Sequence, residues 1–96
     1  MAAYILFIRD NPIRDAAQME LYGKKTRENP TDPKLKVLSV YGATEALEGS
    51  APDGIVMLEF PTVQDAKAWY NSPGYQAATQ HRKKGADYRV IIVQGT

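Results

Sequence analysis

One continuous stretch, residues 55–73, constrains the fold most strongly, because it joins a buried strand to two helices without a long loop. Residues 55–60 (Ile-Val-Met-Leu-Glu-Phe) are apolar at every position except Glu59. Such a short apolar run is typical of a strand with both faces covered. Pro61 follows, and it ends the strand because proline has no backbone N–H to donate to a neighbouring strand.

The two helices of this stretch are indicated by their first residues. Thr62 and Asp65 have the spacing of a capping box, in which the threonine hydroxyl accepts a hydrogen bond from a free backbone N–H of the first turn. Ser72 and Pro73 place a hydroxyl at a second N-cap position and proline at the first helical position. The sequence therefore predicts one helix after Thr62 and another after Ser72.

The remaining elements are predicted from the same kinds of signal. Asn11 followed by Pro12 is one possible helix start, but Asp15 with Gln18 is the favoured cap of the first helix. Thr44–Gly49 could add a short strand or a bulged extension, and Pro52-Asp53-Gly54 forms a turn. The other predicted strands are Ala3–Arg9, Leu35–Gly42 and Tyr88–Val93.

This order of elements is strand, helix, strand, strand, helix, strand. It is the ferredoxin-like βαββαβ arrangement, an α+β fold with a four-stranded antiparallel sheet and helices on one face. The 96 residues are predicted to form a single domain, residues 1–96.

Composition excludes several classes of function. The chain has no cysteine, which rules out disulfides and thiolate chemistry, and its 12 Lys and Arg nearly balance its 11 Asp and Glu. This balance argues against a dedicated nucleic-acid or membrane-surface binder. No segment is apolar over the ~20 residues of a membrane span, and the start has no basic targeting region. We expect a cytoplasmic protein with no metal and no other cofactor.

The strands predict a homodimer. Two helices can cover only one face of the sheet, so the other face should alternate with polar residues if it met water. Three strands are instead apolar on both faces, which would leave a large apolar patch that a second copy would cover. The opposed pairs are Ile5 and Phe7 against Leu6 and Ile8, Ile55 and Met57 against Val56 and Leu58, and Ile91 and Val93 against Val90 and Ile92.

Arg9 and Glu59 are candidate site residues because each is the charged residue near the end of an apolar strand. We expect the two strands to be neighbours that run in the same direction, which would bring Arg9 and Glu59 together at one end of the sheet. There Glu59 could act as a base and Arg9 could orient a polar ligand. The alternative is a structural ion pair.

His81 and Tyr41 complete the candidate set. His81 is the only histidine and could be a general base, or it could simply be a cation favoured near a helix C-terminus. Tyr41, near the end of the second strand, is the tyrosine most suited to face a ligand. An RNA-binding use of this topology lacks support, because the third strand has no paired aromatic residues and carries a carboxylate.

Val56–Pro61 and Ala66–Gln76 together resemble the domain-of-unknown-function family numbered 1330. Segments Glu45–Gly49 and Arg89–Gly95 fit the same pattern, so the resemblance covers nearly the whole chain. It implies a homodimeric α+β barrel of ferredoxin-like subunits. That architecture is similar to those of cofactor-free monooxygenases, muconolactone-isomerase-like proteins and chlorite-dismutase-like haem proteins. The family supplies no agreed catalytic residue.

Two hypotheses of function follow. In the first, the protein binds a small organic molecule in a cavity between sheet and helices and acts on it without metal or flavin, with Arg9, Tyr41, Glu59 and His81 as polar contacts. In the second, it is a non-catalytic dimeric module whose interior is fully packed.

Overall fold

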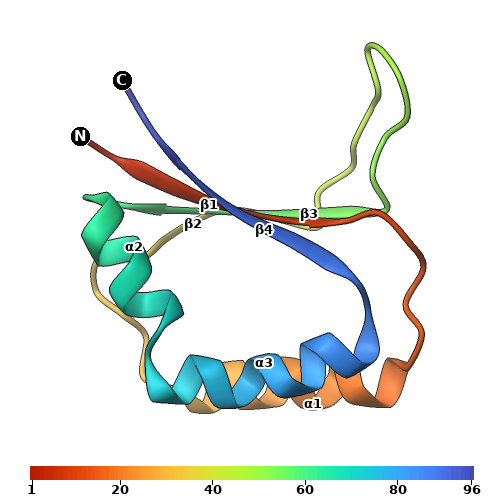
Figure 1. The fold of residues 1–96 in the computed structure, drawn as a ribbon, viewed down its shortest axis with the longest axis horizontal. Coiled ribbons are helices and arrows are strands. Elements are labelled where there is room, and N and C mark those ends of the chain that lie inside the picture. The colour runs from red at the N-terminus through yellow and green to blue at the C-terminus, as the bar shows by residue number, and fades with distance from the viewer.

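The computed structural model describes residues 1–96 and has the predicted α+β architecture (Figure 1). The sheet is antiparallel, with strand order β2-β3-β1-β4, and all helices lie on one side of it. The ferredoxin-like fold class is confirmed. The elements are β1 (Ala3–Arg9), α1 (Ala16–Glu28), β2 (Lys36–Val40), β3 (Gly54–Phe60), α2 (Val63–Tyr70), α3 (Pro73–Gly85) and β4 (Tyr88–Gln94).

The second strand differs most from its prediction. β2 is shorter than the predicted Leu35–Gly42, and its pairing with β3 shifts register between Val37 and Ser39, as in a β-bulge. Residues 44–49 form no strand and belong to a long exposed loop, so the predicted extension is wrong. This loop rises on the side of the sheet opposite the helices, where both termini also lie (Figure 1).

The helix starts agree with two of the three predicted caps. Asp15 accepts a hydrogen bond from the backbone N–H of Gln18, and Thr62 accepts one from the backbone N–H of Asp65. Ser72 occupies the N-cap position of α3, but its hydroxyl donates to the carbonyl of Trp69 instead of capping the helix. The short α2–α3 junction explains this difference, because the last carbonyls of α2 lie beside the first residues of α3.

The layer formed by α1 and α3 is separated from the sheet over most of the length of the two helices (Figure 1). α1 and α3 lie side by side, while α2 runs from the sheet down to that pair at one end (Figure 1). Close packing of α1 against α3 requires Gly85, because a Cβ there would lie 2.7 Å from Cγ of Met19. At the same end of the pair, the backbone N–H groups of Arg14 and Asp15 also donate to the carbonyl of Gly85. These contacts hold α1 against α3, and α2 connects the far end of that pair to the sheet (Figure 1).

The core lies where α2 meets the sheet. Its members are the buried side chains Ile5, Phe7, Leu58, Phe60, Ala66 and Tyr75. Because strand side chains alternate, the neighbours of these strand residues lie on the opposite face. That open face carries Leu6, Ile8, Ile55, Met57, Ile91 and Val93, of which Ile91 and Val93 are 42% and 48% exposed.

The expected proximity of Arg9 and Glu59 is wrong. β1 and β3 are neighbours, but they run antiparallel, so Arg9 pairs with Gly54 and Glu59 pairs with Tyr4. The two charges therefore lie at opposite ends of the sheet. They also lie on opposite faces, because Arg9 follows the buried alternation of Ile5 and Phe7, whereas Glu59 alternates with the buried Leu58 and Phe60. No ion pair between them is possible.

Candidate functional site

A cavity of about 650 Å³ occupies the space between the sheet and the α1–α3 layer. We call it the interlayer cavity. Phe7, Val56 and Leu58 line it from the sheet, and Met19 and Tyr22 line it from α1. A cleft of about 690 Å³, lined by the loop after α1, adjoins it and shares Trp69 and Tyr75. The walls are mostly apolar, which is typical of a site for a small organic ligand.

Aromatic rings form the inner end of the interlayer cavity. Trp69, at the end of α2, lies 4.2 Å from Tyr75 of α3 between ring centroids, and it meets Phe7 edge to face at 6.3 Å. Offset and edge-to-face contacts of this kind add stability beyond the burial of area alone. These rings hold α2, α3 and the sheet in fixed relation, so the cavity has a defined wall.

Two pairs of tyrosine hydroxyls border the same space. The hydroxyls of Tyr22 and Tyr75 are 2.8 Å apart, and those of Tyr41 and Tyr88 are 2.5 Å apart. Burial raises the pKa of Tyr22, Tyr75 and Tyr41 above the ordinary tyrosine value, and for Tyr41 the hydrogen bond to Tyr88 raises the pKa further. All three are therefore neutral phenols at neutral pH. In each pair one hydroxyl donates to the other, which leaves one O–H hydrogen per pair available to another acceptor.

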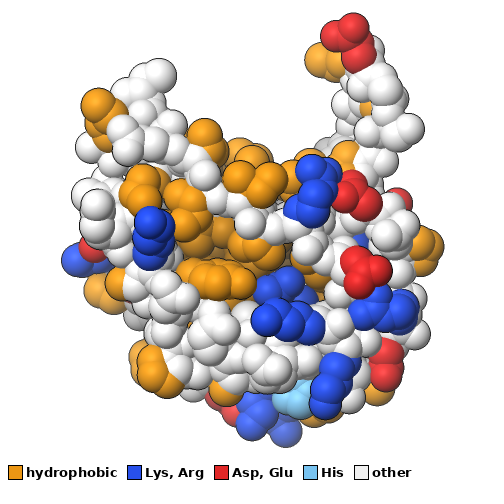
Figure 2. Space-filling view, viewed as in Figure 1, with side chains coloured by type: hydrophobic (Ala, Val, Ile, Leu, Met, Phe, Trp, Pro, Cys, Tyr) orange, Lys and Arg blue, Asp and Glu red, His pale blue; other side chains and the backbone are white.

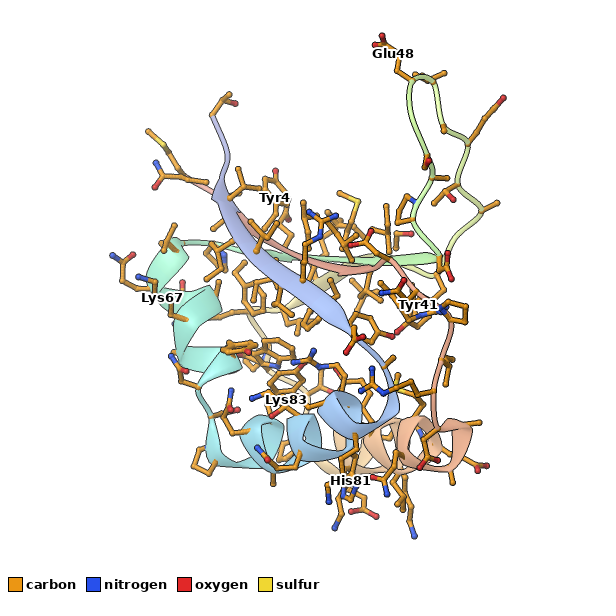
Figure 3. The ribbon with its side chains drawn as sticks, turned by 45° about the vertical axis from the view of Figure 1, so that its right-hand side comes forward. Tyr4, Tyr41, Glu48, Lys67, His81 and Lys83 are labelled. Carbon is orange, nitrogen blue, oxygen red and sulfur yellow. The ribbon has the colours of Figure 1, made fainter.

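Tyr41 has the only positive φ among the non-glycine residues, at 52°. This left-handed conformation is uncommon for a bulky side chain and persists only where the surroundings enforce it. The backbone N–H of Tyr41 donates to the carbonyl of Ile55, and its ring lies against Gly54, where an added Cβ would come within 2.8 Å. The strained backbone directs the phenol below the sheet, on the side of the helices (Figure 3).

Arg9 borders the interlayer cavity close to Tyr41. Its guanidinium donates to the carbonyls of Asn11 and Asp53 and lies 3.9 Å from the carboxylate of Asp53. Its Nε is buried and has no hydrogen-bond partner. The charge of Arg9 is thus partly compensated at the outer edge of the cavity.

Arg82 of α3 has no such partner, although it is only 4% exposed. Its guanidinium carbon lies 5.4 Å from the ring centroid of Tyr88, 5.7 Å from that of Phe7 and 5.9 Å from that of Tyr22. Its buried Nε has no hydrogen-bond partner, and none of the ion pairs of the structure includes Arg82. A positive charge therefore lies in the aromatic wall of the interlayer cavity.

The structure brings together two of the four residues singled out from the sequence. Arg9 and Tyr41 both line the interlayer cavity, whereas Glu59 and His81 do not. Glu59 belongs to the open face of the sheet. His81 lies on the side of α3 that points away from the sheet, where its Nδ1 is 2.8 Å from Oε1 of Gln18 on α1 (Figure 3). The expectation that all four supply contacts to one cavity is wrong, because the helix period and the strand period turn these two side chains away.

Sequence reasoning missed the importance of Arg82 and Tyr88. Arg82 is seven residues after Tyr75 and three after Thr79, so the helical period places it on the same buried stripe. In the sequence it stands in the basic run His81-Arg82-Lys83-Lys84, which does not distinguish it from its exposed neighbours. Tyr88 is the first residue of β4, and alternation with Val90 and Ile92 places it on the face toward the helices.

Two further properties of the chain concern metal ions and membranes. No group of three or more His, Asp or Glu side chains is arranged to hold a metal ion. Among the helices, none combines the length and the apolar character needed to cross a membrane.

Comparison with known proteins identifies the family. The family model described as "Domain of unknown function (DUF1330)" matches residues 2–96. The chain belongs to this family. A comparison with curated proteins found no match.

Solved structures with the same fold have low sequence identity. RPA0582, a protein of unknown function from Rhodopseudomonas palustris, is 19% identical, with a TM-score of 0.68 over 99% of this chain and 82% of that one. A dimeric ferredoxin-like protein of unknown function from Thermobifida fusca is 20% identical, with a TM-score of 0.61 over 96% and 88% of the two chains. SnoaB from Streptomyces nogalater, described as a cofactor-independent oxygenase, is 5% identical, with a TM-score of 0.57 over 99% and 92%. At these identities the likeness establishes the shared fold.

Proposed function

We propose that this DUF1330 protein is a homodimer that binds a small organic molecule in the interlayer cavity. The observation that carries the proposal is the cavity itself, whose apolar walls enclose a few polar groups at defined positions. This combination is the usual construction of a small-molecule site, in which apolar surface supplies affinity and polar groups fix orientation. Arg9 and Tyr41 are the ligand-binding residues at its outer edge.

The proposed chemistry is of the monooxygenase or isomerase kind, without metal or flavin. The fold shared with SnoaB supports this class as an analogy between folds, and the polar groups of the cavity support it chemically. The guanidinium groups of Arg9 and Arg82 and the neutral tyrosine hydroxyls can stabilise negative charge on a ligand. Such charge develops on a ligand oxygen when a proton is removed from a neighbouring carbon. Glu59 and His81 have no part in this proposal because neither lines the cavity.

The open face of the sheet is the main support for the proposed homodimer. Its apolar side chains have no covering element in the chain, and a second copy packed sheet to sheet would bury them around a twofold axis. Related structures from Bacteroides fragilis and Thermobifida fusca are described as dimeric, which supports the same assembly here. The exposed loop of residues 41–53 projects beside this face and would border the second copy (Figure 1).

The alternative function is a non-catalytic dimeric module with a fully packed interior. The interlayer cavity favours binding over this alternative, because a packed module gains stability from filling such a space. A cavity of this size retained beside buried charge is more consistent with a ligand.

Mass spectrometry of gently purified protein tests the proposal, first under native and then under denaturing conditions. We expect a dimer that carries a small molecule, which denaturation releases for identification. Val56→Trp, which fills the cavity from the sheet side, is expected to leave the dimer intact and to abolish the extra mass. An empty dimer that also fails to bind small organic probes would favour the non-catalytic module, and a monomer would overturn the proposed assembly.

A further inference from the structure

The strongest unexplained feature of the molecule is the unpaired charge of Arg82. A buried guanidinium without an anion loses its hydration and gains little in return, which normally destabilises the folded state. Cation–π contacts with Phe7, Tyr22 and Tyr88 offset only part of this cost, because an aromatic ring attracts a cation more weakly than an anion does. A role in stability alone therefore does not account for a charged residue at this position.

The carboxylates of the chain do not compensate Arg82. Asp53, Asp87, Asp65 and Asp10 form the ion pairs of the structure, and their partners are Arg9, Arg14, Lys34 and Arg89. Asp87 shares with Arg82 a smaller cleft of about 470 Å³ on the β4 side, but its carboxylate lies 2.6 Å from Arg14. On that side Figure 2 shows an apolar hollow between sheet and helices, bordered by basic side chains.

The surroundings of Arg82 are suited to one oxygen anion on an apolar body. Both tyrosine pairs border the same cavity, and each keeps one O–H hydrogen free to donate. A guanidinium presents parallel N–H groups that match the two oxygens of a carboxylate. A phosphate ester or dicarboxylate would bring more negative charge than Arg82 alone can balance, since Arg9 is already close to Asp53.

We propose that Arg82 binds the carboxylate of the ligand, and that the ligand is a small apolar monocarboxylic acid. The inference rests on the proposed function, because it names the class of molecule that the interlayer cavity takes. The acid group lies against Arg82 with a phenol hydroxyl as a further donor. The apolar body packs against Phe7, Trp69 and Tyr75.

A matched pair of probes tests the charge requirement without any mutation. 2-Naphthoate and 2-naphthamide have nearly the same shape, but only the first is an anion at pH 7. Isothermal titration calorimetry on the wild-type homodimer is expected to show that naphthoate binds about 10- to 100-fold more tightly, the usual range for a hydrogen bond to a charged group. Thermal unfolding of the same samples provides a second measure of binding.

Variants then assign the preference to Arg82. Arg82→Gln is expected to bind both probes with similar, weak affinity, whereas Arg82→Lys retains part of the preference because it keeps the charge and loses the planar fork. Lys84→Gln removes one charge from the same helix end at an exposed position and is the matched control. It should keep the full preference for naphthoate.

Each outcome has a separate meaning. Equal affinity of the wild-type protein for both probes would overturn the role of Arg82 while leaving the cavity as a binding site. A preference for naphthoate that survives in Arg82→Gln would also overturn the role of Arg82 in binding. If Arg82 serves only to hold the rings of Phe7, Tyr22 and Tyr88, the unfolding temperature of this variant would fall while its preference stays. Failure of both probes to bind would overturn the proposed function, and this inference with it.

Discussion

The face of the sheet toward the helices and the open face carry alternate residues of the same strands, and both are apolar. They differ in their polar groups. On the face toward the helices, Arg9 and Tyr88 line the interlayer cavity together with Arg82. On the open face, Tyr4 pairs with Glu59 at one end of the sheet, and the centre is apolar. An apolar face with polar groups around a cavity suits a small ligand, whereas an apolar face without a cavity suits a flat protein partner.

The largest expected effect is on the open face. Met57→Lys places a charge at the centre of β3, where a second copy would remove it from water. We expect the dissociation constant of the dimer to rise at least about 30-fold, since burying an unpaired charge at an interface costs roughly 2–5 kcal/mol. Native mass spectrometry and light scattering measure this change. Leu21→Lys on α1 is the control, and a dimer that persists in Met57→Lys would place the interface elsewhere.

The helix-side face is tested by Gly54→Ala. The new Cβ would lie 2.8 Å from the ring of Tyr41, so the ring must move and its hydrogen bond to Tyr88 must lengthen. We expect a loss of about 1–3 kcal/mol in the free energy of unfolding, as for other overpacked sites, together with weaker binding of 2-naphthoate. Urea denaturation and calorimetry measure the two effects.

Gly23→Ala is the matched control for this prediction. Gly23 lines the same cavity from α1, but an added Cβ meets only the flexible end of Arg27, at 3.1 Å. Within a helix the change from glycine to alanine is favourable by up to about 1 kcal/mol. The two substitutions should therefore change stability in opposite directions, and equal losses would contradict the special role of the contact between Gly54 and Tyr41.

A smaller effect concerns α2, the one helix that joins the sheet to the other helices. Hydrogen bonds from Lys34 and then from Thr62 hold the pKa of Asp65 below its ordinary value. Because the folded-state pKa is the lower one, this contribution to stability is present above the unfolded-state pKa of about 3.9 and is lost as the pH falls below it. The difference in unfolding temperature between the wild-type protein and Asp65→Asn should shrink between pH 6 and pH 3. A constant difference would contradict the shift.

The smallest expected effects are those of Glu59→Gln and His81→Gln on ligand binding. Neither side chain reaches the interlayer cavity, so the affinity for 2-naphthoate should stay within about twofold of the wild-type value. Tyr41→Phe is the comparison that should weaken binding, because it removes a hydroxyl at the edge of the cavity. A strong loss of affinity in Glu59→Gln would mean that the open face contributes to the site.

Much of the fold follows from local sequence signals. Asp15 and Thr62 cap their helices as predicted, and Pro61 follows the last residue of β3. These signals act within a few residues, so the sequence contains them completely. The hydroxyl of Ser72 is an exception, because its acceptor is a carbonyl of the preceding helix.

The candidate site was less accessible to prediction. Tyr41 and Arg9 were found because each ends a strand, but their proximity depends on the pairing of β1 and β3 and on the turn at Gly54. Arg82 follows the helical period of Tyr75 and Thr79, but this period alone does not identify it as part of a site. Its significance depends on the absence of a carboxylate near it, and that absence appears only when every chain segment is in position.

The sequence alone determined the order of the strands and the approximate limits of most elements, and it determined that both sheet faces are apolar, because these properties depend on residue periodicity. The tertiary structure decided the direction of β1 relative to β3, which separates Arg9 from Glu59. It also decided the space left by α2 between the sheet and the α1–α3 layer. Distances between residues far apart in the chain depend on packing, and in this protein packing brings Arg82 beside Phe7, Tyr22 and Tyr88.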